Sequence, residues 1–169
     1  MAEKTSRFFI PAILAILAYE WLVSGFDKLL SGTFVADMHH EMVGAIPDMQ
    51  YTFYAHLLQK YGMLHCEIIA TLVIVGELAV GISLGLLAYF VYRGQLNSKI
   101  TKLGIITALV SAFMTLNFYF YQGGSFFIST SDPFDEGIPI DLIMVLIQVV
   151  VAFYFWSANK PMKKQLANQ

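Results

Sequence analysis

Charged side chains interrupt two of the most apolar stretches of this 169-residue sequence. In the first stretch, Glu20, Ser24 and Lys28 recur every four residues, which would stack them along one face of a helix. In the second, Glu77 stands among leucine, valine and glycine residues. An ionisable group in such a stretch is costly and normally faces the interior of a helix bundle or a wet cavity. A carboxylic acid held there can exchange a proton near neutral pH, so these residues indicate proton-transfer chemistry.

Two amides extend the pattern to the other apolar stretches. Counted from the lysine- and arginine-rich end of each stretch, four groups lie roughly 18 to 24 Å along a helix that rises about 1.5 Å per residue. The four are Glu20, Glu77, Asn117 and Gln148. Their similar depth predicts one polar layer that four helices share and that faces away from lipid.

This polar layer has two interpretations, and both stay open at the level of the sequence. In the structural one, Glu77 and Lys28 form an interior ion pair, while Asn117 and Gln148 supply hydrogen bonds between helices. In the functional one, Glu20 or Glu77 is a proton acceptor beside a quinone or another redox ligand.

Aromatic residues gather at the end of the third apolar stretch, beside Asn117. They are Phe118, Tyr119, Phe120 and Tyr121, followed by Phe126 and Phe127. Such a group is typical of the aromatic belt at a membrane–water interface. The alternative is that Tyr119 and its neighbours wall a quinone headgroup site near Asn117.

A metal centre is not expected. The four histidines lie in the first long connection or at its end, none of them in the middle of an apolar stretch: His39, His40, His56 and His65. Asp37 and Glu41 flank two of them, but the spacing matches no specific metal-binding motif. Cys66 is the only cysteine, so neither an intrachain disulfide nor a Cys-x-x-Cys pair can form.

The composition places these groups in a membrane. Hydrophobic residues make up 57% of the sequence and charged residues only 13%, whereas a soluble domain has roughly 25% charged residues. The apolar residues also form runs that are too long for the core helices of a soluble protein. The formal net charge of -2 gives no indication of a nucleic-acid partner. We therefore expect a single integral membrane domain over residues 1–169, in contact with membrane lipid.

Four runs are long enough to cross a bilayer. They cover about residues 8–30, 66–92, 100–121 and 138–156, and each supplies the roughly 20 residues that a transmembrane helix needs. Strands are excluded because lipid cannot satisfy the open edge of a sheet. The first run lacks a convincing cleavage site and is interpreted as a retained span. The predicted fold is an all-α transmembrane four-helix bundle.

Basic residues mark one side of this bundle. The segments predicted for that side carry Lys4 and Arg7, then Arg93, Lys99 and Lys102, then Lys160, Lys163 and Lys164. The other two connections are acidic or neutral. The positive-inside bias therefore predicts that both termini are cytoplasmic. We also expect the protein to lie in the inner (cytoplasmic) membrane of the cell.

The two outer connections differ in character. Residues 31–62 are too apolar for a free loop and are divided by Gly44 and Pro47, which predicts one or two short helices on the outer interface. Residues 123–137 predict a turn-rich loop, and Pro139 suits the first turn of the last span.

Glycines accompany Glu77 on its predicted helix. Gly81 and Gly85 follow it at i+4 and i+8 and form a Gly-x-x-x-Gly step, which permits close approach of a second helix. This step predicts a tight interhelical contact beside Glu77, with Lys28 as the opposite charge that neutralises it.

Two segments resemble a known family. Residues 19–30 read Tyr-Glu-Trp-Leu-Val-Ser-Gly-Phe-Asp-Lys-Leu-Leu, and residues 76–87 read Gly-Glu-Leu-Ala-Val-Gly-Ile-Ser-Leu-Gly-Leu-Leu. They are similar to the first-helix and second-helix motifs of the DoxX/DoxD-type membrane proteins. The resemblance matches these residues to the family pattern: Gly25 and Lys28 in the first helix, Glu77 and Gly81 in the second, and Asn117 in the third. Glu20 and the histidine-bearing connection have no counterpart in that pattern.

The resemblance implies a function. The DoxD branch is the membrane subunit of thiosulfate:quinone oxidoreductase, which passes electrons from thiosulfate to quinone. On that expectation, Glu77 and Lys28 are catalytic residues, and a partner polypeptide handles the sulfur donor. Glu20 is added as a third catalytic residue because of its position in the predicted polar layer. The residues expected at a bound quinone are Asn117, Gly81 and Tyr119. The alternative is a non-catalytic accessory subunit that packs into a larger membrane complex; a small transporter is disfavoured because the spans show no duplicated broken-helix pattern.

Overall fold

The computed structural model describes the backbone of residues 2–123 and 140–167, and the side chains of residues 8–123 and 140–159. Most of the loop predicted over residues 123–137 lies outside the described residues, as do Pro139, Phe126 and Phe127.

Four long helices build the described part of the chain. They are α1 (Ala2–Ser31), α4 (Cys66–Tyr92), α5 (Ser98–Gln122) and α6 (Ile140–Ala167). Each contains a stretch that is long and apolar enough to cross a membrane. The predicted all-α fold with four spans is confirmed, and the span predicted over 66–92 coincides with α4. The chain is a multi-pass membrane protein.

Local sequence signals explain where α4 ends and α5 begins. Gly94 follows α4 with a φ of +65°, a left-handed conformation that favours glycine. The Asn97 side chain then caps α5 by accepting hydrogen bonds of 3.0 Å from the backbone N–H groups of Lys99 and Ile100. At the other end of α5, Gly123 adopts a φ of +75° as the C-cap. The short connection over residues 93–97 makes α4 and α5 antiparallel neighbours.

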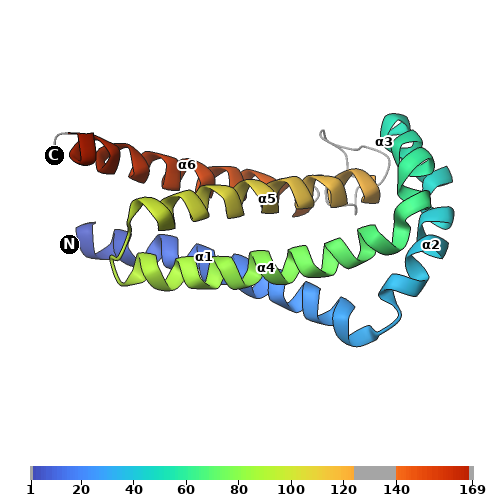
Figure 1. Ribbon diagram of the computed structural model, residues 1–169, viewed down its shortest axis with the longest axis horizontal. Helices are drawn as coiled ribbons and strands as arrows, with labels where there is room; N and C mark the ends of the chain where they lie inside the picture. Colours follow the sequence, from blue (N-terminus) through green and yellow to red (C-terminus); the bar gives the residue numbers. More distant parts are fainter. Residues whose placement is uncertain (1, 124–139, 168–169) are drawn as a thin grey trace, which may run out of the picture.

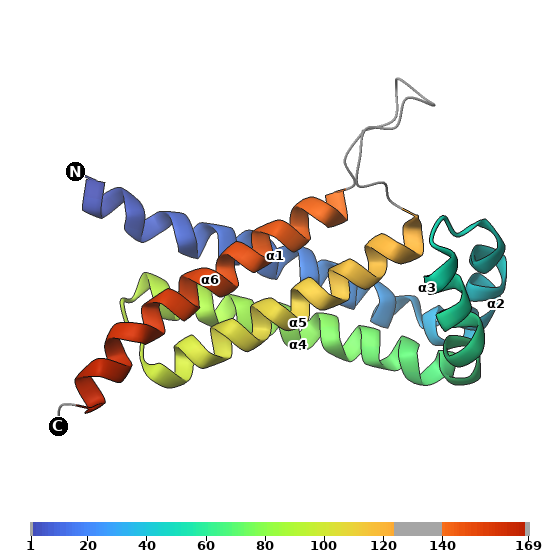
Figure 2. The same ribbon diagram turned by 90° about the horizontal axis from the view of Figure 1, so that it is seen from above.

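The four helices form two close pairs. Helix α1 packs along α4, helix α5 packs along α6, and α4 joins the pairs through a smaller contact with α5. Figure 1 shows the α5–α6 pair above the α1–α4 pair, and Figure 2 shows how the pairs cross. The beginning of α1, the α4–α5 connection and the end of α6 lie at one end of the bundle. This arrangement agrees with the prediction that both termini lie on one side.

Side chains from all four helices fill the bundle interior. The largest fully buried ones include Trp21 from α1, Leu84 from α4, Tyr119 from α5 and Phe155 from α6. The outward faces are apolar as well, and large exposed side chains recur along each helix: Ile16, Leu72, Phe113 and Phe153 are examples. A helix that is apolar all round is typical of a membrane span, so the outer faces contact lipid.

Glycine permits the close approach of α1 and α4 at two positions. A Cβ atom added at Gly81 would lie 2.7 Å from Cγ and 3.0 Å from the backbone N of Leu22, and one added at Gly25 would lie 2.9 Å from Leu78. The tight contact predicted from the Gly-x-x-x-Gly step is therefore confirmed at Gly81. At Gly85 the nearest atom would be 3.9 Å away, which is ordinary van der Waals contact.

Short helices cap the opposite end of the bundle. They are α2 (Phe34–Ala45), a 3-10 turn η1 (Ile46–Asp48) and α3 (Thr52–Leu57). The chain then continues through a π-helical turn η2 (Leu58–Gly62) and a 3-10 turn η3 (Met63–His65) into α4. The predicted short helices are confirmed, and Pro47 lies where the first of them gives way to the 3-10 turn. Figure 1 shows α2 and α3 across the end of the bundle that is opposite the termini.

Candidate functional site

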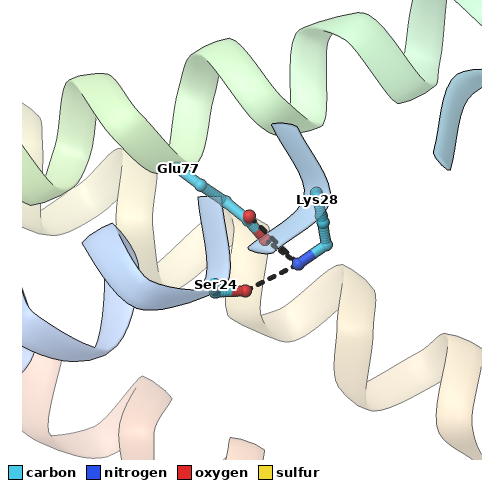
Figure 3. Close-up of polar contacts among 3 residues, drawn as sticks. All are labelled: Ser24, Lys28 and Glu77. Atoms are coloured by element: carbon cyan, nitrogen blue, oxygen red, sulfur yellow. Dashed lines mark hydrogen bonds and ion pairs between the residues drawn. The ribbon is translucent and has the colours of Figure 1, made fainter. Parts of the chain in front are cut away.

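An ion pair joins α1 to α4 inside the bundle (Figure 3). Lys28 Nζ lies 2.9 Å from Oε1 and 3.0 Å from Oε2 of Glu77, so the ammonium faces both carboxylate oxygens. The same ammonium donates a hydrogen bond of 2.6 Å to Ser24 Oγ. Ser24 lies one helical turn before Lys28, which is the direction in which a long side chain on a helix points. The predicted pairing of Glu77 with Lys28 is confirmed.

The two partners of this ion pair differ in exposure. The Glu77 side chain is 0% exposed, whereas the Lys28 side chain is 22% exposed. The carboxylate is thus enclosed and depends on Lys28 for its counter-charge. Removing one partner of such a pair leaves an uncompensated buried charge, which is strongly destabilising. Lys28 is therefore the partly exposed member of the pair.

Glycine packing sets the geometry of the pair. Gly25 lies between Ser24 and Lys28 on α1, and a Cβ atom there would be 3.2 Å from Cβ of Glu77. Gly81 lies one turn after Glu77 and packs against Leu22. The two helix backbones therefore meet on both sides of the carboxylate. Gly81 was expected to contact a quinone, but the structure fills the space beside it with Leu22, so its role is packing.

Two aromatic rings lie near the Lys28 ammonium. Its Nζ lies 5.7 Å from the centroid of the Phe34 ring and 5.9 Å from that of Phe118, within the range of a cation–π interaction. Phe34 is the first residue of α2, and Phe118 belongs to α5. The Phe118 ring also lies 6.4 Å from the ring of Trp21. Aromatic side chains from α1, α2 and α5 thus lie around the Lys28 ammonium.

Glu20 lies at the edge of this group. Its side chain is exposed, so the expectation that it joins a buried layer with Glu77 is wrong. It remains within electrostatic range of Glu77, Lys28 and Asp141, the last of which belongs to the first turn of α6. The reason is the helical repeat. A turn takes 3.6 residues, so Glu20, eight residues before Lys28, points about 80° away from it around the helix axis.

The two predicted amides bond between elements but do not meet Glu77. Asn117 Oδ1 accepts a hydrogen bond of 3.2 Å from the Tyr54 hydroxyl of α3, and its Nδ2 donates to the backbone of Phe113. Gln148 is 1% exposed, and its Oε1 lies 3.1 Å from the Thr115 hydroxyl of α5. The structural interpretation, in which these amides supply bonds between elements, is confirmed. The single predicted layer is instead divided into separate contacts.

Tyr119 belongs to an aromatic cluster at the capped end of the bundle. It is fully buried, and its hydroxyl lies 2.9 Å from the hydroxyl of Tyr51. The Phe120 ring packs edge-on against the rings of Tyr51 and Phe53. An interfacial belt residue would face lipid headgroups, so the belt interpretation is wrong for Tyr119. The cluster joins α5 to the short outer helices.

Several residues of the site were not predicted. Trp21 lies beside Glu20 in the segment that resembles the first family motif, yet only the packing shows that its ring meets Phe118. Phe34 carries no sequence signal, since it follows a turn and precedes a helix of mixed character. Among the described residues, no three histidine, cysteine, aspartate or glutamate side chains gather as metal ligands.

The fold and the site together define an α-helical multi-pass membrane protein with an enclosed ion pair between its first two spans. Comparisons with protein-family models, with curated proteins and with solved structures give no match for this chain.

Proposed function

We propose that this chain is the membrane subunit of a quinone-linked oxidoreductase in the cytoplasmic membrane, with the quinone headgroup beside Lys28. The observation that supports the proposal is the ammonium of the partly exposed Lys28 side chain, which lies near the rings of Phe34 and Phe118 and is paired with the enclosed Glu77 carboxylate. The favoured electron donor is thiosulfate or a related sulfur compound, as the DoxX/DoxD resemblance implies.

The chemistry of these side chains suits a quinone. A quinone headgroup is a flat ring with carbonyl oxygens, so it needs a hydrogen-bond donor at an oxygen and apolar or aromatic surfaces against the ring. Lys28 supplies the donor, and the rings of Phe34 and Phe118 supply the surfaces. Ser24 and Glu77 hold the ammonium in place through hydrogen bonds.

A bound quinone would accept two electrons from the sulfur donor and two protons from the surrounding water, and it would leave as the quinol. In the proposed site, Lys28 binds and orients a ring oxygen. Glu77 keeps the ammonium charged, because an isolated cation in a low-dielectric interior would lose its proton. Glu20, exposed and within electrostatic range of the pair, is placed to carry protons between the bundle surface and Lys28.

This function requires partner polypeptides. The described residues form helices that span the membrane and a small cap, and the chain carries no motif for a one-electron cofactor. We propose that a separate chain oxidises the sulfur donor and delivers electrons to the quinone at the membrane.

A non-catalytic accessory subunit is the second candidate. The observation in its favour is that the Lys28–Glu77 pair satisfies itself and is held by Gly25 and Gly81. An ion pair of this kind can serve only to fix α1 against α4. The chain would then position other subunits of a larger membrane complex.

Quinone retention distinguishes the two candidates. The purified chain is loaded with decylubiquinone in detergent, and the quinone that remains bound per chain is extracted and measured. We expect Glu77→Gln to lose bound quinone. Glu67→Gln is the matched control, because Glu67 is exposed in the first turn of the same helix. Retention by neither the wild type nor the control would overturn the proposal.

A double substitution separates folding from binding. Lys28→Met combined with Glu77→Gln removes both charges, so no unpaired charge is left in the interior and the fold is expected to stay stable. We expect this variant to unfold at a temperature near that of the wild type while binding no quinone. If it retains quinone like the wild type, the charged pair serves structure alone and the accessory function is favoured.

A further inference from the structure

Two hydrogen-bonding atoms in the bundle interior have no partner among the described residues. Trp21 Nε1 and Gln148 Nε2 make no hydrogen bond with any of the residues that the structure describes. The two side chains are 2% and 1% exposed. Buried polar atoms are nearly always paired, because an unpaired one loses its hydration without compensation. Two such atoms in a small bundle therefore indicate a polar group that the described part of the chain does not supply.

Both side chains meet the same turn of α5. The Trp21 ring lies against Phe118, and the Gln148 amide lies against Thr115. Thr115 and Phe118 are three residues apart and thus on one face of that helix. Trp21 comes from α1 and Gln148 from α6, whose backbones approach each other less closely than those of α1 and α4.

The Gln148 amide can present either of its ends. Thr115 Oγ1 lies 3.0 Å from the Ser111 backbone oxygen and 3.1 Å from Gln148 Oε1, but a hydroxyl has a single proton to donate. When it donates to Ser111, the amide can turn over so that Nε2 donates to Thr115 and Oε1 is unpaired. One end of the amide lacks a partner in either orientation. Gln148 can therefore donate to a carbonyl oxygen or accept from a hydroxyl.

We propose that Trp21 Nε1 and the unpaired end of the Gln148 amide bind a ring oxygen of the quinone headgroup, at a second contact point next to Lys28. This inference rests on the proposed function and adds binding residues to it. Phe118 connects the two contact points, because its ring centroid lies 6.4 Å from that of Trp21 and 5.9 Å from the Lys28 ammonium. A quinone and its quinol differ at the ring oxygens, which are carbonyls in one and hydroxyls in the other. The reversible Gln148 amide suits both forms.

The test measures the affinity for decylubiquinone of two variants that each remove one contact. Trp21→Phe keeps an aromatic ring and removes the N–H, and Gln148→Leu keeps the approximate volume and removes the amide. We expect each variant to bind about three- to tenfold more weakly, the loss that follows from one uncharged hydrogen bond. The matched controls are Trp156→Phe, on the exposed face of α6, and Asn159→Leu, a buried amide that bonds to Thr101 and Ser98.

Fluorescence gives an independent readout that stability does not affect. The sequence has only two tryptophans, so Trp156→Phe leaves Trp21 as the single fluorescent tryptophan. We expect decylubiquinone to quench this protein with saturation at the affinity that retention gives. The reciprocal Trp21→Phe protein reports Trp156, whose lipid-facing position predicts a quench that rises linearly with quinone.

Failure of this inference differs from failure of the proposed function. If quinone binds, Glu77→Gln abolishes binding, and Trp21→Phe and Gln148→Leu bind as well as the wild type, the two donors hold internal water and only the second contact point is wrong. If no variant and no wild-type protein binds quinone, the proposed function fails and the second contact point with it. Linear quenching of Trp21 would also overturn the contact.

Discussion

The free-energy balance of the site depends on one lysine. The Lys28 ammonium donates hydrogen bonds to both oxygens of the Glu77 carboxylate and to the Ser24 hydroxyl as well. Moving an ion pair from water into a low-dielectric interior costs free energy, and removing only one of its two partners costs far more because it leaves a buried charge unpaired. Lys28 therefore has two roles that a single substitution cannot separate, namely the neutralisation of Glu77 and the donation of a hydrogen bond.

Substitutions of the three residues should form a graded series. Lys28→Met leaves a buried carboxylate unpaired and is expected to lower the free energy of unfolding by about 3–5 kcal/mol. Ser24→Ala removes one hydrogen bond from a charged donor and should lower it by roughly 1.5–3 kcal/mol. The measurement is unfolding in mixed detergent micelles, followed by circular dichroism. Equal effects of the two substitutions would show that the carboxylate is not enclosed.

The helix pairs are the elements that bring these residues together. Gly25 and Gly81 allow α1 and α4 to touch on both sides of Glu77, and Gly104 receives the Phe155 ring where α5 meets α6. Without the first contact, the Lys28 side chain would not reach the carboxylate in the observed geometry. The two glycines therefore act on the site through the distance between helices.

Alanine substitutions test this dependence on one helix. Gly81→Ala places a methyl group against the Leu22 backbone and should cost about 1–3 kcal/mol by overpacking. Gly85→Ala is the control, because its nearest neighbour would lie 3.9 Å away. We expect only the first variant to lower the unfolding temperature and the retention of decylubiquinone. A comparable loss in both variants would contradict the glycine contact.

The short outer helices are attached through a hydrogen bond that can be removed cleanly. Tyr54→Phe deletes the hydroxyl that donates to Asn117 and should cost roughly 0.5–1.5 kcal/mol. Faster amide hydrogen exchange in α3, with unchanged exchange in α4, is the expected result. Tyr61→Phe serves as the control, since the Tyr61 side chain is exposed on the same segment. Unchanged exchange in α3 would mean that ring packing alone holds the cap.

The elements were predictable from the sequence because long apolar runs allow few structures. A membrane span must satisfy every backbone group within itself, so the run over 66–92 could form only a helix. The Lys28–Glu77 pair was predictable too, because opposite charges in lipid have few ways to be neutralised. The depth of a residue follows from counting, but its direction does not. Glu20 lies within electrostatic range of Glu77 but on an exposed face, and Tyr119, expected either in an interfacial belt or beside a quinone, is fully buried against the short outer helices.

At the scale of the whole molecule, the two ends of the bundle have different chemistry. One end carries the termini and the exposed basic residues Arg93, Lys99 and Lys102. The opposite end carries the cap of α2 and α3, with Asp37, Asp48 and the exposed histidines. Such an asymmetry orients a membrane protein during insertion, with the basic end retained in the cytoplasm. The ion pair lies toward the capped end, since α1 reaches Lys28 in its last turn.

The single cysteine makes this orientation testable. Cys66 is partly exposed and begins α4 at the capped end, so a membrane-impermeant maleimide should label it from outside in right-side-out membrane vesicles. A Cys66→Ser, Lys99→Cys protein moves the thiol to the exposed start of α5 and should be labelled only after the membrane is permeabilised. The reverse pattern would place the termini outside. The Lys28 side of the bundle would then face the cytoplasm, and the partner that delivers electrons would have to be a cytoplasmic protein rather than one on the outer side.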